Sequence, residues 1–111
     1  MNNFPATAPS PETVLHSVHI TWNDNVDSDH GARVAEALNT YASTVPGLLF
    51  YRAGNDLALR ENTADFGIVA LFDNSTHYKS YAVDEGHQAI IAELIAPSAR
   101  TRTSTQIAFA R

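Results

Sequence analysis

The sequence contains no cysteine. Disulfides, thiolate metal sites and a cysteine nucleophile are therefore excluded, and nothing in the composition points to an oxidising compartment. Long apolar runs are also lacking, since no segment approaches the roughly 20 apolar residues of a membrane-spanning helix. The first residues show no basic region followed by an apolar stretch, as a secretory signal would. The expectation is a soluble cytoplasmic protein that does not contact membranes.

Charge of either sign is scarce. Charged residues make up 17% of the chain and hydrophobic residues 44%, whereas charged residues reach about 25% in typical soluble domains. This shortage favours a surface that is partly buried against a partner. The 12 acidic residues outnumber the 7 basic ones, which gives a net charge of -5 at pH 7. Such a chain repels phosphate backbones, so no nucleic-acid partner is expected.

The chain of 111 residues is long enough for one domain with a genuine core. Residues 1–12 hold three of the five prolines among Ala, Ser, Thr and Asn. This composition cannot support a packed core and predicts a flexible N-terminal arm. Residues 13–111 are predicted to form the domain itself.

Hydrophobic periodicity predicts the elements of that domain. Apolar residues at helical spacing run from Val34 to Val45 and stop at Pro46, and a more apolar helix stops at Pro97. Asn74 or Ser75 is the expected N-cap of a short helix between them. The predicted elements, in chain order, are a strand at 14–22, a helix from about 30 to 45, strands at 48–54 and 65–72, helices at 75–83 and 87–96, and a strand at 102–111.

This order is β-α-β-β-α-β, which predicts an α+β, ferredoxin-like protomer with a four-stranded antiparallel sheet. Helices on one side of the sheet leave its other face uncovered. That face carries Leu15, Val69 and Leu71, and a monomer rarely exposes so large an apolar patch. The sequence therefore predicts a homodimer in which a second copy covers this face, giving a dimeric α/β barrel.

Over Leu15 to Phe109 the chain resembles the Dabb family, the dimeric stress-responsive α/β-barrel domains. The resemblance rests on the order and spacing of four segments, namely LHSVHITW, VPGLLFYRAGND, FGIVALFDNSTHYKSY and YAVDEGH. The family includes plant stress proteins without a settled chemistry and a plant polyketide cyclase. The resemblance thus implies either a structural protein or an enzyme.

In that cyclase a Tyr and a His with this separation act in the acid–base catalysis of an intramolecular aldol closure. The resemblance implies these roles for Tyr81 and His87, and it implies a pocket position for His16. Leu38 and Phe66 stand where the cyclase has a Tyr and a His, which implies a more apolar pocket. Asp84-Glu85 replaces the His-Pro that is common in the family.

Contact between Tyr81 and His87 requires a break in the helix. In one continuous helix a separation of six residues turns two side chains about 240° apart. Asp84 and Gly86 are capping and helix-breaking residues, and they predict that Tyr81 ends one helix and His87 begins the next. A helix N-terminus favours a neutral imidazole, whereas the neighbouring carboxylates favour the charged form. The balance stays open at the level of the sequence.

These residues predict a small apolar pocket that binds a hydrophobic or aromatic metabolite. In it, His87 would remove a proton next to a carbonyl while Tyr81 donates to the oxyanion, without metal or organic cofactor. The predicted walls are His16, Val18, Val34, Leu38, Phe66, Ile68 and Ile91. Two alternatives remain open: a non-catalytic stress-responsive barrel in which Tyr81 and His87 are structural, and a cofactor-free monooxygenase of the related dimeric barrel fold.

The other histidines do not predict a metal site. His16 and His19 project to opposite faces of a strand, and His30 and His77 lie near helix starts, where we expect polar surface residues. A calcium-loop spacing also occurs, in Asn25, Asp27, Asp29 and Glu36. The loop needs glycine where His30 stands, so these side chains are predicted to cap the helix instead.

Overall fold

The computed structural model describes residues 13–109. The predicted arm of residues 1–12 and the last two residues of the predicted closing strand lie outside the described residues. The elements are β1 (Val14–Trp22), α1 (His30–Ala42), β2 (Leu48–Asn55), β3 (Phe66–Phe72), α2 (Ser75–Val83), α3 (Glu85–Ile90), a π-helical turn η1 (Ile91–Ile95) and β4 (Ala99–Ala108). Their order confirms the predicted β-α-β-β-α-β, ferredoxin-like fold.

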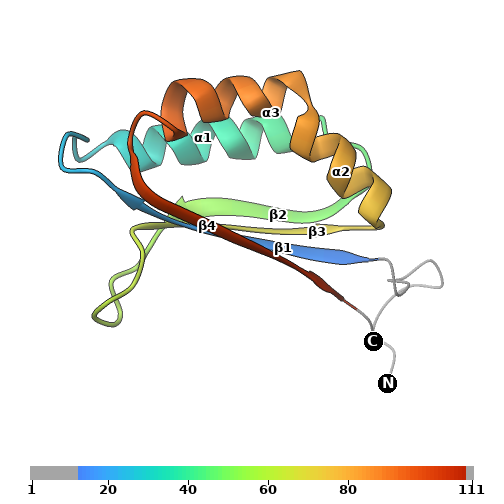
Figure 1. The fold of residues 1–111 in the computed structure, drawn as a ribbon, viewed down its shortest axis with the longest axis horizontal. Coiled ribbons are helices and arrows are strands. Elements are labelled where there is room, and N and C mark those ends of the chain that lie inside the picture. The colour runs from blue at the N-terminus through green and yellow to red at the C-terminus, as the bar shows by residue number, and fades with distance from the viewer. Residues whose placement is uncertain (1–12, 110–111) are drawn as a thin grey trace.

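The four strands form one antiparallel sheet in the order β2-β3-β1-β4. Within residues 13–109, the helices lie on one face of this sheet and leave the opposite face bare (Figure 1). The loop between β2 and β3 projects on the bare side. Among residues 13–109, no helix combines the length and the apolarity that crossing a bilayer requires.

Cross-strand partners share a face of the sheet, so the register defines rows of side chains. On the bare face one row is apolar across all four strands, and it consists of Phe50, Leu71, Leu15 and Ile107. Phe50 and Ile107 are 49% and 53% exposed. Val69, in the next row, is 42% exposed. The bare face thus carries the apolar patch that the sequence predicts.

The main core lies between α1 and the sheet. Val34 and Leu38, one helical turn apart, are fully buried and belong to one cluster with Ile20, Phe66 and Ile68. Burial of side chains of this size contributes about 1.5–3 kcal/mol each. This packing fixes α1 directly against the middle of the sheet.

The predicted helix break is present at Asp84. Asn74 caps α2 by accepting a hydrogen bond from the His77 backbone N–H at 2.8 Å, and α2 ends at Val83. Asp84 has an extended backbone, and its carboxylate accepts from the Gly86 N–H at 3.0 Å. The chain therefore changes direction between Tyr81 and His87, as the capping residues predict.

His30 differs from its prediction as a polar surface residue, and that prediction is wrong. Its side chain is only 7% exposed. The ring meets Trp22 edge to face with 4.8 Å between centroids, and Nε2 donates to the Leu94 carbonyl at 2.9 Å. The cause is the π-helical turn, which packs over the first turn of α1 and covers the imidazole.

Candidate functional site

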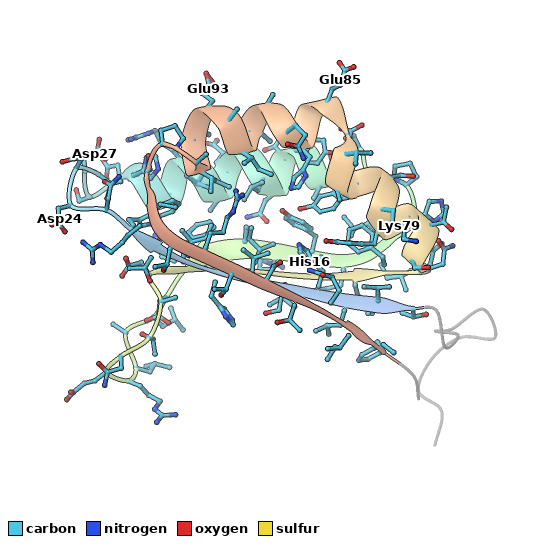
Figure 2. The ribbon with its side chains drawn as sticks, in the orientation of Figure 1. His16, Asp24, Asp27, Lys79, Glu85 and Glu93 are labelled. Carbon is cyan, nitrogen blue, oxygen red and sulfur yellow. The ribbon has the colours of Figure 1, made fainter. Side chains whose placement is uncertain are left out.

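A cavity of about 360 Å³ lies between α2, α3 and η1 on one side and β1, β3 and β4 on the other. Several of the predicted site residues line it, namely His16, Val18, Ile68, Tyr81, His87 and Ile91. Figure 2 shows His16 on the helix side of the sheet. The structure thus gathers the two predicted catalytic residues and the predicted pocket histidine around one space.

Three predicted wall residues lie elsewhere. Val34, Leu38 and Phe66 do not line this cavity and are buried in the core beneath α1. Both helical residues have an exposed fraction of zero. Because α1 packs directly on the sheet, it leaves no space for a ligand there.

The cavity also has walls that the sequence reasoning missed. From the helical side come Tyr78, Ala82, Gln88 and Ile95, and from the sheet come Ile20, Arg102, Thr103 and Ser104. The contribution of β4 changes the character of the site, because it adds polar and charged groups to a pocket that was expected to be apolar.

Tyr81 and His87 are in contact. Their ring centroids are 4.0 Å apart with 32° between the planes. Tyr81 is 2% exposed and packs on Phe72, and its hydroxyl lies 3.4 Å from the Tyr51 hydroxyl. His87 Nδ1 is buried, and it has no hydrogen-bond partner among the described residues. His87 itself lines the cavity, so its imidazole can contact a ligand there.

Tyr41 of α1 supports the contact between Tyr81 and His87, because it contacts both Asp84 at the helix break and His87. The Tyr41 hydroxyl donates to Asp84 Oδ2 at 2.7 Å, and the Tyr41 ring lies parallel to His87 with 6.2 Å between centroids. This hydrogen bond lowers the pKa of Asp84 and keeps it ionised. A Cβ atom on Gly86 would lie 2.9 Å from Tyr41 Cε1. Glycine therefore permits the close approach that places His87 beside Tyr81.

Burial sets the protonation states at the pair. It lowers the pKa of His87, an effect that the Ala82 carbonyl opposes and the positive charge of Arg102 reinforces. Burial likewise raises the pKa of Tyr81. At neutral pH the imidazole is therefore neutral and can accept a proton, while the phenol keeps its proton and can donate a hydrogen bond.

His16 is the third polar group deep in the cavity. Burial, and next the charge of His87, lowers the pKa of His16 to about 4. The Gln106 amide nitrogen lies 3.0 Å from Nδ1. An amide nitrogen only donates, so Nδ1 accepts and the ring proton sits on Nε2. His16 is thus a neutral hydrogen-bond donor at physiological pH.

This shift predicts a loss of stability in acid. Between pH 6.5 and about 4 the unfolded chain binds a proton at His16 that the folded chain does not bind. The contribution of His16 to the free energy of unfolding is therefore complete above pH 6.5 and falls as the pH is lowered, by about 3 kcal/mol in total. Urea denaturation of wild type and His16→Gln between pH 7 and 4, at one protein concentration, measures the difference.

His16→Gln should flatten this pH dependence, because the glutamine side chain does not titrate. An equal loss of stability in wild type and His16→Gln would show that His16 titrates normally.

Comparison with known proteins identifies the class of protein. The model of the stress responsive A/B barrel domain family, Dabb, matches residues 14–107. Because this match covers most of the chain, the chain belongs to the Dabb family, as the four sequence segments indicated. No curated protein matches the chain at a significant level.

Solved structures share the fold over nearly the whole chain. A dimeric ferredoxin-like protein of unknown function from Thermobifida fusca is 29% identical, with a TM-score of 0.84, over 97% of this chain and 100% of that one. A Dabb family protein from Mesorhizobium loti is 15% identical, with a TM-score of 0.73, over 90% and 99% of the two chains. A hydroxynitrile lyase from Passiflora edulis is 12% identical, with a TM-score of 0.77, over 92% and 97%.

Proposed function

We propose that this Dabb protein binds a small hydrophobic or aromatic metabolite in the cavity and carries out cofactor-free acid–base chemistry on it, of the polyketide cyclase or lyase type. The observation that carries the proposal is the contact of Tyr81 with His87, whose ring centroids are 4.0 Å apart at the wall of the cavity. The volume of about 360 Å³ falls at the lower end of the range for small-molecule pockets. The hydroxynitrile lyase with the same fold supports the lyase reading.

The chemistry follows from the protonation states of the pair. Neutral His87 accepts a proton from the carbon next to a ligand carbonyl. The electron pair of the broken C–H bond forms a C=C bond, and the π pair of the carbonyl moves to its oxygen. Tyr81 donates a hydrogen bond to the enolate oxygen that forms. Tyr81 is almost fully buried, and a hydrogen bond in such an environment is stronger than one in water.

We propose further that the protein is a homodimer, with the bare faces of two sheets packed together. The apolar row from Phe50 to Ile107 supports this arrangement, because it would otherwise face water. The Thermobifida fusca protein, 29% identical, is dimeric. In such a dimer each cavity stays on the helical side of its own protomer.

Hydrogen–deuterium exchange tests the catalytic proposal without knowledge of the natural substrate. Small aryl ketones are incubated with the protein in deuterated buffer, and proton NMR follows the signal of the hydrogens next to the carbonyl. Enzymatic proton abstraction should accelerate their loss. Ligands that bind in the cavity but exchange no faster than in buffer would favour the non-catalytic barrel, and oxygen consumption with a quinol substrate would favour the monooxygenase.

A further inference from the structure

The cavity has two chemically different sides. The inward positions of β4 are Arg102, Ser104 and Gln106, which pair with Ile20, Val18 and His16 of β1. Above them, η1 contributes the apolar side chains of Ile91 and Ile95. The cavity residues of α3 are the polar His87 and Gln88. A ligand that fills this space meets the isoleucines of η1 and the rings of Tyr81 and His87 on the helical side. Along β4 it meets polar and charged side chains.

Arg102 supplies a positive charge to this wall. Among the residues that the structure describes, no carboxylate lines the cavity and none forms an ion pair with Arg102. Glu85 and Glu93, on the helices above, point away from the sheet (Figure 2). The nearby carboxylate of Asp84 is held by Tyr41. The cavity therefore presents a cation without a counter-ion, in a chain whose net charge is -5.

The two histidines do not add to this charge at neutral pH. Burial lowers the pKa of both His16 and His87, so both rings are neutral hydrogen-bonding groups. The charge of the site at pH 7 is that of Arg102. A guanidinium presents its donors as a planar fork that matches the two oxygens of a carboxylate.

We propose that the ligand of this cavity is an aromatic carboxylate, with its ring against Ile91 and Ile95 of η1 and its carboxylate on the guanidinium of Arg102. Ser104, one inward position further along β4, supplies a hydroxyl donor beside it. This inference rests on the proposed function, because it concerns the ligand of the same cavity. Beyond that function, it specifies that the ligand is negatively charged and that its carboxylate points toward β4.

Paired probes test the charge separately from the occupancy of the cavity. A panel of aromatic carboxylates, such as 3-phenylpropanoate, is compared with the matching primary amides, which have nearly the same shape and no charge. Dissociation constants come from chemical-shift changes of the amide signals of α3 and β4 at pH 7 and low salt. Wild type should bind the carboxylates about tenfold more tightly than their amides, as expected for a charge-assisted pair.

Substitution then assigns the preference to one side chain. Arg102→Gln should reduce the ratio of carboxylate affinity to amide affinity from about ten to about one. Arg100→Gln is the matched control, because Arg100 lies on the same strand but pairs with Asp24 and does not line the cavity. It should keep the wild-type preference. Both substitutions replace exposed residues, and thermal unfolding checks that the fold is intact.

The outcomes separate this inference from the proposed function. Equal binding of carboxylates and amides by wild type, or a preference that survives in Arg102→Gln, would overturn the role of Arg102 while leaving the cavity as the binding site. If no member of the panel shifts signals from the cavity, both the inference and the binding proposal fail.

Discussion

Replacement of His87 by alanine is expected to lower the rate of proton exchange at the carbon next to a ligand carbonyl by about 10²–10⁴-fold, the contribution that a positioned general base typically makes. The reason is that His87 Nδ1 is the buried imidazole nitrogen without a partner among the described residues, and burial keeps the ring neutral. Proton NMR in deuterated buffer measures the exchange rate for wild type and variant under identical conditions.

His77→Ala is the control for this substitution. His77 is half exposed and pairs with Asp73 at 2.6 Å, and it is not among the cavity residues. Its loss should leave exchange unchanged. Tyr81→Phe keeps the ring and removes the hydroxyl, and a loss of about 10²–10³-fold is expected if the hydroxyl stabilises an enolate. If His87→Ala and His77→Ala exchange at the same rate, His87 is not the base.

The helix break between Tyr81 and His87 could be predicted because it depends on local chemistry, whereas the sequence left the contact between the two rings open. Asp84 caps through its own side chain, and Gly86 permits a close approach to Tyr41. The capping preference of aspartate and the small size of glycine can both be recognised from a few neighbouring residues. The helical repeat alone would have separated the two rings. The fold class was predictable for a similar reason, since it follows from the order and periodicity of elements.

The division between core and cavity could not be predicted in the same way. Periodicity shows that Val34 and Leu38 face inward, but both a core wall and a cavity wall face inward. The difference arises because α1 lies directly on the sheet, while α2, α3 and η1 leave a space. The distance between each helix and the sheet depends on how side chains pack between the two layers. The π-helical turn, closed by the hydrogen bond from Ala96 N–H to the Ile91 carbonyl, also has no simple sequence signal.

Arg102 could not be predicted as a cavity residue, because its direction depends on the register of β4 against β1. The strand that contains Arg102 could be predicted. Because side chains alternate between the two faces of a strand, Arg102, Ser104 and Gln106 share one face. Which face looks toward the helices depends on the pairing of β4 with β1, and a shift by one residue would invert it. The observed pairing of Ile20 with Arg102 settles the direction. The polar wall follows from that single pairing.

Phe50→Glu and Ile107→Glu are each expected to convert the dimer into a monomer. Both residues lie in the apolar row of the bare face, on the two edge strands, and both are about half exposed in the protomer. A carboxylate at either position costs the protomer little, because water still reaches it. In the dimer it would be buried without a partner in both copies, and such burial costs several kcal/mol.

A cost of this size corresponds to a rise of at least roughly 10³-fold in the dissociation constant of the dimer. Light scattering at micromolar concentration should give twice the chain mass of 12.1 kDa for wild type and the single mass for the two variants. Val83→Asp is the control, because Val83 is 74% exposed but ends α2 on the helical side of the sheet, and it should remain dimeric.

A wild-type mass of 12.1 kDa, or variants that stay dimeric, would show that the bare face does not bind a second copy. Conversely, loss of the dimer with both glutamates and retention with Val83→Asp would place the interface on the face opposite the cavity, so that each protomer keeps its own site.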